Sequence, residues 1–211
     1  MDVDECMKER RSCRSYSTKS VPVEIVGEIL EAATYAPSSG NRQNWVFIVV
    51  MDDTRKEELC MASAKQTWML EAPVFIVVCD KKADVVEMYP DRGELYAVQN
   101  CALATQNLML KAHSFGLGTC WVGAFDADAV SRIMKIPSDV VPEAIITLGY
   151  PSKYEKEAGR HPVDTVTFFN EYGNKKLDES MFPLKKQVKK IGNKIKDTRE
   201  KGLGLLKKLK K

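Results

Sequence analysis

Three arginines lie close together near the start of the chain. Arg10, Arg11 and Arg14 fall within five residues and flank Ser12. A guanidinium can pair with two phosphate oxygens at once, so such a cluster is suited to a phosphate-bearing ligand. The same cluster could be solvated surface charge, and its spacing does not separate the two interpretations.

A second polar stretch follows an expected helix that ends near Ala36 and precedes an apolar run over residues 45–51, which predicts a buried strand. Pro37 ends the helix, and Gly40 and Asn41 tolerate a positive φ. Its short polar groups could cap a turn or contact a ligand, and they belong to Ser38, Ser39, Asn41 and Gln43.

A third stretch contains three closely spaced glycines. Gly116 can end the long helical pattern before it, but this explains neither Gly118 nor Gly123, which bracket residues 119–122. Because glycine has no side chain, a flat ligand can lie directly against its backbone.

Together these stretches resemble the nitroreductase family of FMN-dependent NAD(P)H oxidoreductases. The resemblance rests on RRSCR at residues 10–14, APSSGNRQNW at 36–45 and GLGTCWVGAFD at 116–126. Shorter matches follow in the family's order, at Ile136-Pro137, at residues 142–144 and at 148–151, so the resemblance spans about residues 4–170. One departure is Asn44, where the family usually has proline, and we expect this change to loosen the loop.

The resemblance implies a cofactor site in three parts. The flavin phosphate and ribityl chain would be held by Arg10, Arg11, Ser12 and, from far along the chain, Arg160. Arg14 would lie near flavin N1 and O2 and stabilise the reduced, anionic flavin. Backbone N–H groups of Val122, Gly123 and Ala124 would face N5 and O4.

The loop would reach a flavin at a dimer interface, as it commonly does in the family. Its cofactor-binding residues would be Pro37, Ser38, Ser39, Asn41 and Gln43, and Gln66 would meet the pyrimidine ring. No side chain is predicted to be catalytic, because in flavin enzymes the cofactor carries the hydride and the protein supplies position and electrostatics.

The resemblance thus implies an enzyme that passes hydride from NAD(P)H through flavin N5 to a small acceptor such as a nitroaromatic or quinone. One alternative is specialised flavin chemistry on the same scaffold, either reductive dehalogenation or flavin fragmentation. Another is a flavin-binding module without catalysis, recruited by its basic tail. The lid between Lys81 and Asp91 would decide the substrate, but its residue types do not identify one.

The element pattern favours an α+β fold, which the resemblance makes a three-layer sandwich with a central mixed sheet flanked by helices. The apolar runs predict strands over 45–51, 72–79, 120–122 and 144–148, and helical patterns cover 4–13, about 22–36, 53–64, 92–115 and 126–134. Between Leu95 and Ala112, 12 of 18 positions are apolar. A helix without a broad polar face needs a second surface to cover it, so we expect a homodimer.

Charge divides the 211 residues into a body, 1–174, and a tail, 175–211. The tail carries 13 lysines and one arginine against four acidic residues, a net charge of +10. Because the whole chain carries +3, the body carries −7. Leu184, Val188, Ile191 and Ile195 recur at helical spacing among lysines, which predicts a basic amphipathic helix. Residues 184–211 could therefore bind an anionic membrane surface or an acidic protein, or cover an acidic body. Nucleic acid ranks lowest, because only Phe182 could stack on bases.

The remaining features favour a cytoplasmic protein, peripheral to a membrane at most. The N-terminus is acidic, no stretch of about 18 apolar residues could span a membrane, and six scattered cysteines predict buried, reduced thiols. His113 and His161 are the only histidines and are expected to be structural, and no spacing suits a metal.

Overall fold

The computed structural model describes residues 1–153, 155, 156 and 158–175. The chain divides into two compact units, residues 1–157 and the segment from Ala158 onward. The predicted amphipathic helix of residues 184–211 lies outside the described residues, and the predicted boundary at residue 174 stays a prediction.

The first unit is built on a four-stranded sheet in the order β1-β2-β4-β3. Every pair of neighbouring strands is antiparallel. The prediction of a mixed sheet is therefore wrong for these four strands. Among the described residues, the one parallel pairing is an isolated bridge between Ser12 and Thr119. Strand direction was implied by the resemblance alone, since apolar runs do not encode it. The strands are β1 (Trp45–Val50), β2 (Val74–Asp80), β3 (Gly118–Val122) and β4 (Val141–Gly149).

The two central strands are the most deeply buried. Every residue of β2 is buried, as its continuous apolar run predicted. The expectation that the run over 45–51 is a buried strand is wrong, because β1 is an edge strand that leaves Val46 and Val49 exposed. An apolar run does not distinguish a central strand, which has a neighbouring strand on each side, from an edge strand, which has only one.

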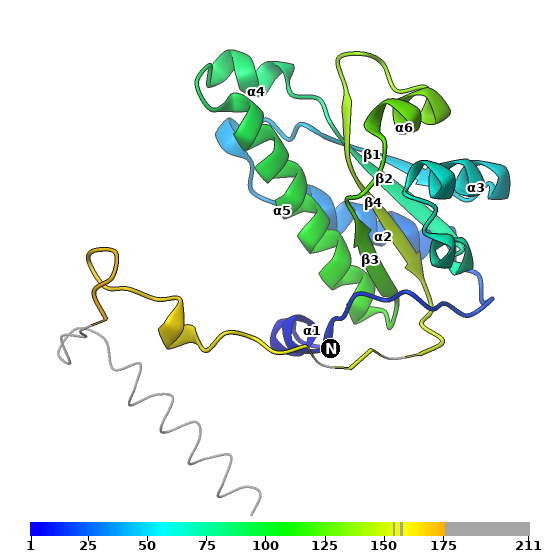
Figure 1. The fold of residues 1–211 in the computed structure, drawn as a ribbon, viewed down its shortest axis with the longest axis horizontal. Coiled ribbons are helices and arrows are strands. Elements are labelled where there is room, and N and C mark those ends of the chain that lie inside the picture. The colour runs from blue at the N-terminus through cyan, green and yellow to red at the C-terminus, as the bar shows by residue number, and fades with distance from the viewer. Residues whose placement is uncertain (154, 157, 176–211) are drawn as a thin grey trace, which may run out of the picture. The chain divides into compact units, whose positions relative to one another are not determined.

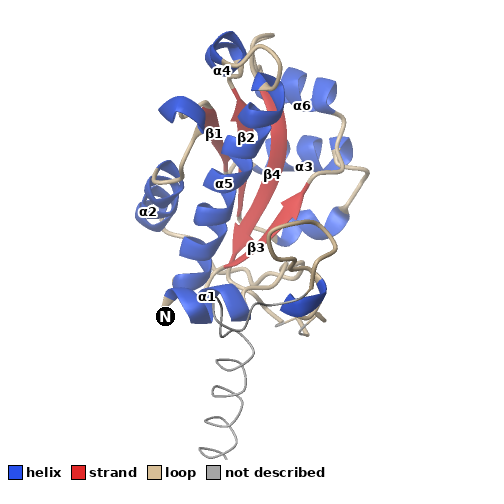
Figure 2. Ribbon diagram, turned by 90° about the vertical axis from the view of Figure 1, so that its left-hand side faces the viewer, coloured by secondary structure: helices blue, strands red, loops and turns tan. Residues whose placement is uncertain are grey.

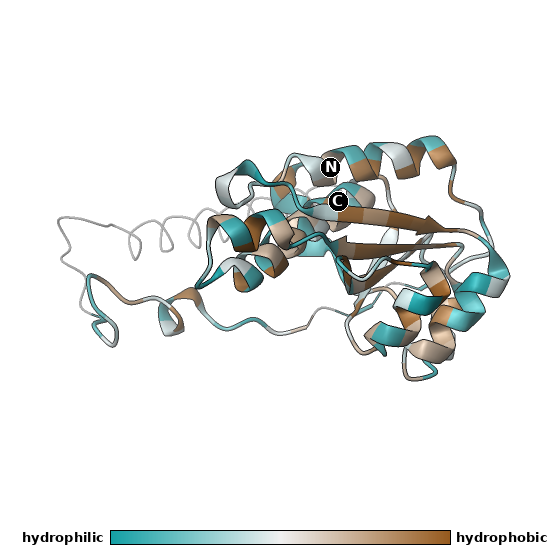
Figure 3. Cartoon of the chain, turned by 90° about the horizontal axis from the view of Figure 1, so that it is seen from above, coloured by the Kyte–Doolittle hydropathy of each residue, from teal (hydrophilic) through white to brown (hydrophobic). Residues whose placement is uncertain are grey.

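Helices cover both faces of the sheet, which gives the three-layer sandwich (Figures 1 and 3). One face packs on α2 (Val23–Thr34) and α5 (Gly93–Ser114), and the other on α3 (Asp53–Ala62) and α6 (Ala127–Met134). Figure 3 shows the apolar strands between the two helical layers. All four helices were predicted from apolar periodicity, and the α+β class is confirmed.

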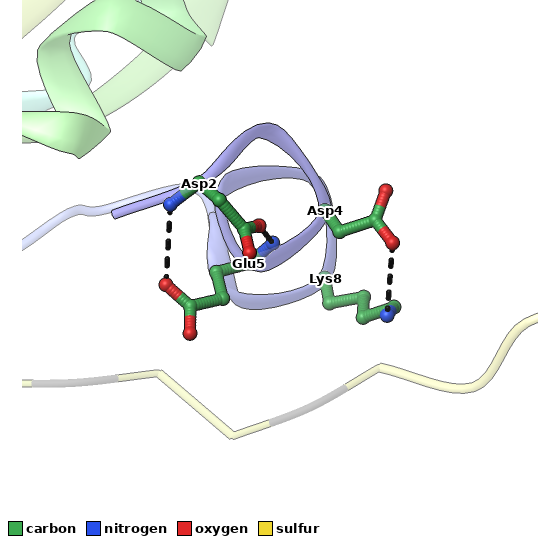
Figure 4. A network of polar contacts seen from close by, with 4 residues as sticks. All are labelled: Asp2, Asp4, Glu5 and Lys8. Carbon is green, nitrogen blue, oxygen red and sulfur yellow. Dashed lines mark hydrogen bonds and ion pairs between the residues drawn. The ribbon is translucent and has the colours of Figure 1, made fainter.

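Side-chain caps fix where several helices begin. Asp52 accepts a hydrogen bond from the N–H of Arg55 at the start of α3. The first helix, α1 (Val3–Glu9), has a capping box in which Asp2 and Glu5 each accept from the other's backbone N–H (Figure 4). The helix ends at Glu9, so the arginine cluster that was expected within a helix to residue 13 is extended instead.

Three short elements had no signal in the sequence. They are α4 (Ala83–Met88), η1 (Ser39–Asn41) and η2 (Thr67–Glu71). Among the described residues of the second unit, η3 (Val163–Thr165) precedes a contact between the rings of Phe168 and Tyr172. No helix within the described part of the chain has the length and apolar content that a membrane span needs.

Candidate functional site

The arginine segment runs beside β3 after α1 ends. Ser12 forms the parallel bridge with Thr119, and the N–H of Cys13 donates to the Thr119 carbonyl at 2.8 Å. The segment is therefore held in an extended conformation, in which successive side chains point to opposite sides.

Arg10, Ser12 and Arg14 all act on the thiol of Cys120 in β3. Burial raises the pKa of Cys120, and the charges of Arg14 and Arg10 and a hydrogen bond with Ser12 oppose this rise. Three residues of the predicted phosphate and flavin set therefore lie near the Cys120 thiol. Their alternate positions in the sequence are what an extended segment requires.

Arg11 has different neighbours. Its guanidinium donates to the carbonyl oxygens of Lys8 and Arg10 at the end of α1. It also lines a cavity of about 250 Å³ together with Cys13 and His113. The structure thus separates Arg11 from Ser12 and Arg14, and its predicted role at the phosphate stays a prediction.

The end of β3 exposes backbone. Val122 is buried, whereas Gly123 and Ala124 are exposed and Trp121 is 40% exposed. Within the described residues, no hydrogen bond uses the N–H of Gly123 or Ala124. These amides follow directly after the strand that pairs with the arginine segment, so a ligand along β3 would reach both.

Gln66 lies just before a segment that packs beside the arginines. The Arg14 guanidinium is 5.7 Å from the ring centroid of Trp68. Glu71, at the end of η2, accepts from the N–H of Tyr16 at 3.0 Å. Gln66 itself donates to the Ser63 carbonyl at 3.0 Å, so its amide has a structural partner in addition to its predicted ligand.

The loop over residues 37–43 has the conformation that its residue types predicted. Gly40 and Asn41 have φ of 57° and 55°, and Gln43 joins them at 47°. Ser38 Oγ accepts from the N–H of Gln43 at 3.1 Å, and the Gln43 amide donates to Asn41 Oδ1 at 3.2 Å. Much of the loop's hydrogen-bonding capacity therefore shapes the loop itself.

Helix α4 packs on this loop through Met88. A Cβ at Gly40 would lie 2.5 Å from Met88 Sδ and 3.2 Å from the Tyr89 hydroxyl. Gly40 therefore allows both the positive φ and the close approach of α4. The region between Lys81 and Asp91, expected to be a lid, thus touches the loop directly.

Three buried residues that sequence reasoning missed hold the loop from below. Ser39 donates to Asn100 in α5, which is hydrogen bonded to Asn44, and Asn44 donates to Asp80 at 2.6 Å. The expectation that Asn44 loosens the loop is wrong, because this side chain is 5% exposed and bonded on both sides. Polar residues at strand and helix positions gave no signal that they would meet.

The loop and the arginine cluster lie at opposite ends of α5. The loop is bonded to Asn100, while His113 near the other end is close enough to Arg10 for their charges to interact. These two helix positions are separated by roughly 20 Å along the axis. Figures 1 and 2 likewise place α1 and α4 at opposite ends of α5. One copy of the chain does not bring the loop to its own arginines.

The other candidates remain separate. Arg160 belongs to the second unit, where it is exposed and donates to the carbonyl oxygens of Ala158 and Gly159. Burial lowers the pKa of His113. All six cysteines are free and buried, as predicted. The described residues contain no cluster of three His, Cys, Asp or Glu side chains that could hold a metal.

A sequence model of the nitroreductase family matches residues 7–67 and 55–150. These matches cover most of the first unit, including all three stretches singled out in the sequence. The chain belongs to the nitroreductase family.

Individual relatives agree with membership of the nitroreductase family. The chain is 37% identical over 157 residues to a protein of Methanothermobacter thermautotrophicus named NADH dehydrogenase/NAD(P)H nitroreductase, a match that covers 72% of this chain and 79% of that protein. It is 26% identical over 182 residues to the FMN reductase (NADPH) of Bacillus subtilis, covering 80% and 73%. The solved structure of the oxidoreductase YcnD from Bacillus subtilis superimposes with a TM-score of 0.75 at 27% identity, over 82% of this chain and 76% of that one. The nitroreductase fold is therefore confirmed.

Proposed function

We propose that this nitroreductase-family protein is an FMN-dependent oxidoreductase that takes hydride from NAD(P)H and reduces a small acceptor such as a nitroaromatic or quinone. The observation that carries the proposal is the pairing of the arginine segment with β3, through the Ser12–Thr119 bridge and the Cys13 N–H, with exposed residues at the strand's end. The FMN reductase among its relatives supports the choice of cofactor.

The residues along β3 suit the parts of FMN. Arg10 and Ser12 would hold the phosphate and ribityl chain. The role of Arg160 at the phosphate stays a prediction. The exposed N–H groups of Gly123 and Ala124 are donors for the carbonyl and nitrogen edge of a flavin ring. When bound, FMN supplies the hydride-accepting and electron-donating chemistry that no side chain here provides.

The chain's own contribution is position and charge. Arg14 is exposed and lies over Trp68, so its cation is held near the strand without an acidic partner among the ion pairs of the described residues. A fixed cation beside the ring would stabilise negative charge on reduced flavin and so favour reduction. The side chain of Trp121 beside Gly123 would limit water at the same edge.

The site is completed by a second copy of the chain. The loop over residues 37–43 cannot reach the arginines of its own chain, so in a homodimer each loop would serve the partner's flavin. Helix α5 supports this arrangement, because Leu95, Val98 and Leu103 are 46%, 42% and 45% exposed on the single chain. An apolar surface of this kind is typical of a permanent subunit interface.

Two measurements test the proposed function. The purified protein should be yellow with a bound-flavin absorption spectrum, and it should oxidise NADH or NADPH with menadione far faster than the same concentration of free FMN. A colourless protein that FMN does not reconstitute would refute the proposal. Bound FMN without turnover above free FMN would favour the non-catalytic module instead.

The basic segment 184–211 is proposed to bind anionic surfaces rather than to complete the active site. Each lysine near an anionic membrane surface contributes about 1 kcal/mol, and salt reduces this gain. A chain shortened to end at Asn174 should keep FMN and turnover and lose co-sedimentation with phosphatidylserine vesicles. Loss of flavin or of the dimer on shortening would show instead that the segment is structural.

A further inference from the structure

Three buried polar side chains lie beneath the loop over residues 37–43. Asn44, Asp80 and Asn100 are 5%, 1% and 2% exposed. Asn44 directly precedes β1, Asp80 is the last residue of β2, and Asn100 lies in the first half of α5. Burying a polar group costs free energy unless the group is hydrogen bonded, so each of these three side chains needs hydrogen-bond partners.

The orientation of the Asn44 amide is fixed by two acceptors. Its Nδ2 donates to Asp80 Oδ1 at 2.6 Å and to the Ala97 carbonyl at 3.1 Å. A carbonyl and an ionised carboxylate can only accept, so the amide cannot turn its oxygen toward them. Asn44 Oδ1 must therefore face the other way, where Asn100 Nδ2 donates to it at 2.7 Å.

The same reasoning carries the orientation on to the loop. Because Asn100 uses its nitrogen on Asn44, its Oδ1 faces Ser39 and accepts from the backbone N–H at 3.0 Å and from Oγ at 3.3 Å. The Ser39 hydroxyl thus donates inward and presents its lone pairs away from the network. The Ala97 carbonyl and the Asp80 carboxylate at one end of the network, and the Ser39 N–H at the other end, impose the same direction on its hydrogen bonds.

The carboxylate itself is not placed for stability. Burial raises the pKa of Asp80, while the hydrogen bond from Asn44 and the charge of Lys82 lower it and Glu94 raises it. Glu143, an acidic residue in β4, lies close enough for its negative charge to repel that of Asp80. Among the described residues, Asp80 Oδ2 is buried without a hydrogen-bond partner.

We propose that Asp80, Asn44 and Asn100 are positioning residues that fix the direction of hydrogen bonding at Ser39, so that the loop offers an acceptor, and not a donor, to the flavin of the partner subunit. This inference rests on the proposed function, which gives the loop its ligand. The three residues touch no flavin themselves and act only through Ser39.

The proposal is tested by a double-mutant cycle between Asn100→Ala and Ser39→Ala, read as the dissociation constant for FMN in the full chain. Asn100→Ala removes the acceptor that holds the Ser39 hydroxyl, so the hydroxyl can turn, and we expect it to weaken FMN binding by about tenfold, the effect of one misdirected hydrogen bond. In the Ser39→Ala background the same substitution should have no effect. Asn107→Ala is the matched control, since Asn107 lies on the same helix and is partly buried outside the network.

A second readout does not need the flavin. Hydrogen exchange of the Ser39 amide in the FMN-free protein should accelerate by about tenfold in Asn100→Ala and stay unchanged in Asn107→Ala. Asn44→Ala, which removes the acceptor of Asn100 Nδ2, should also accelerate this exchange and serves if Asn100→Ala does not fold. Unchanged Ser39 exchange, or an Asn100→Ala effect on FMN that persists without the Ser39 hydroxyl, would overturn the inference. Failure of the wild-type chain to bind FMN would refute the proposed function, and the exchange measurement would still decide the network.

Discussion

Glycine-to-alanine substitutions should have opposite effects at two positions of this protein. Gly118 begins β3 and is buried, and a Cβ there would lie 2.6 Å from Cys13 Cβ and 2.7 Å from Cys13 Sγ. Ordinary contacts begin near 3.4 Å, so the arginine segment must move away from β3. Overpacking of this kind costs about 1–3 kcal/mol of folding free energy.

Gly27 provides the matched comparison. It lies inside α2, is exposed, and a Cβ there would meet nothing within 4 Å. Alanine in a helix interior is more favourable than glycine by roughly 0.5–1 kcal/mol, so Gly27→Ala should stabilise the fold. Urea unfolding of both variants, with and without FMN, gives the two free energies.

The cause at Gly118 can be isolated with a second substitution. Both atoms in the way belong to the Cys13 side chain, so Cys13→Gly should make room and remove most of the Gly118→Ala penalty. Because Cys13 lies between Ser12 and Arg14, Gly118→Ala should also weaken FMN binding, whereas Gly27→Ala should not. If Gly118→Ala costs the same stability with and without the Cys13→Gly substitution, the steric account is refuted.

Three further outcomes follow from charges and exposed surfaces. Arg14→Ala should lower the flavin reduction potential, measured by equilibrium dye reduction, while FMN affinity changes less; equal, small effects on both would mean that Arg14 is only surface charge. Leu103→Asp should place a charge in the proposed subunit interface and weaken the dimer by roughly 30-fold or more in sedimentation measurements, and an unchanged dimer would exclude this face of α5. Burial lowers the pKa of His113, so below about pH 6.5 the unfolded state binds a proton that the folded state does not, and stability falls as the pH falls. His113→Gln should flatten that part of the melting-temperature profile, and an unaltered profile would contradict the assignment.

The layers of this fold were predictable because they depend on local patterns. The apolar run that became β2 and the long periodic pattern that became α5 are each sufficient to identify their element. The edge position of β1 was not predictable, because it depends on which strands pair and not on the composition of Trp45–Val50. Helix α4 has six residues, too few to show a periodicity, and its place is set by Met88 packing on Gly40.

The candidate site was predictable in its residue types but not in its geometry. The cluster RRSCR predicted a cationic pocket, and three of its members do lie near the Cys120 thiol. The separation of Arg11 from Ser12 and Arg14 follows from where α1 ends, since only an extended segment alternates its side chains. The distance between the arginines and the loop depends on the length of α5, a relation that neither motif contains.

Asn44 shows how a departure from a family pattern can be misjudged when only the loop is considered. Replacing proline removes a restraint on φ, so the sequence predicts a looser segment. The asparagine, however, also adds a donor and an acceptor, and these find Asp80 and Asn100 in elements that lie 36 and 56 residues away in the chain. Buried amides with satisfied partners restrain a backbone, and they also impose a direction on the next hydrogen bond. The substitution therefore exchanges a restraint that acts within one residue for one that joins the loop to β2 and α5.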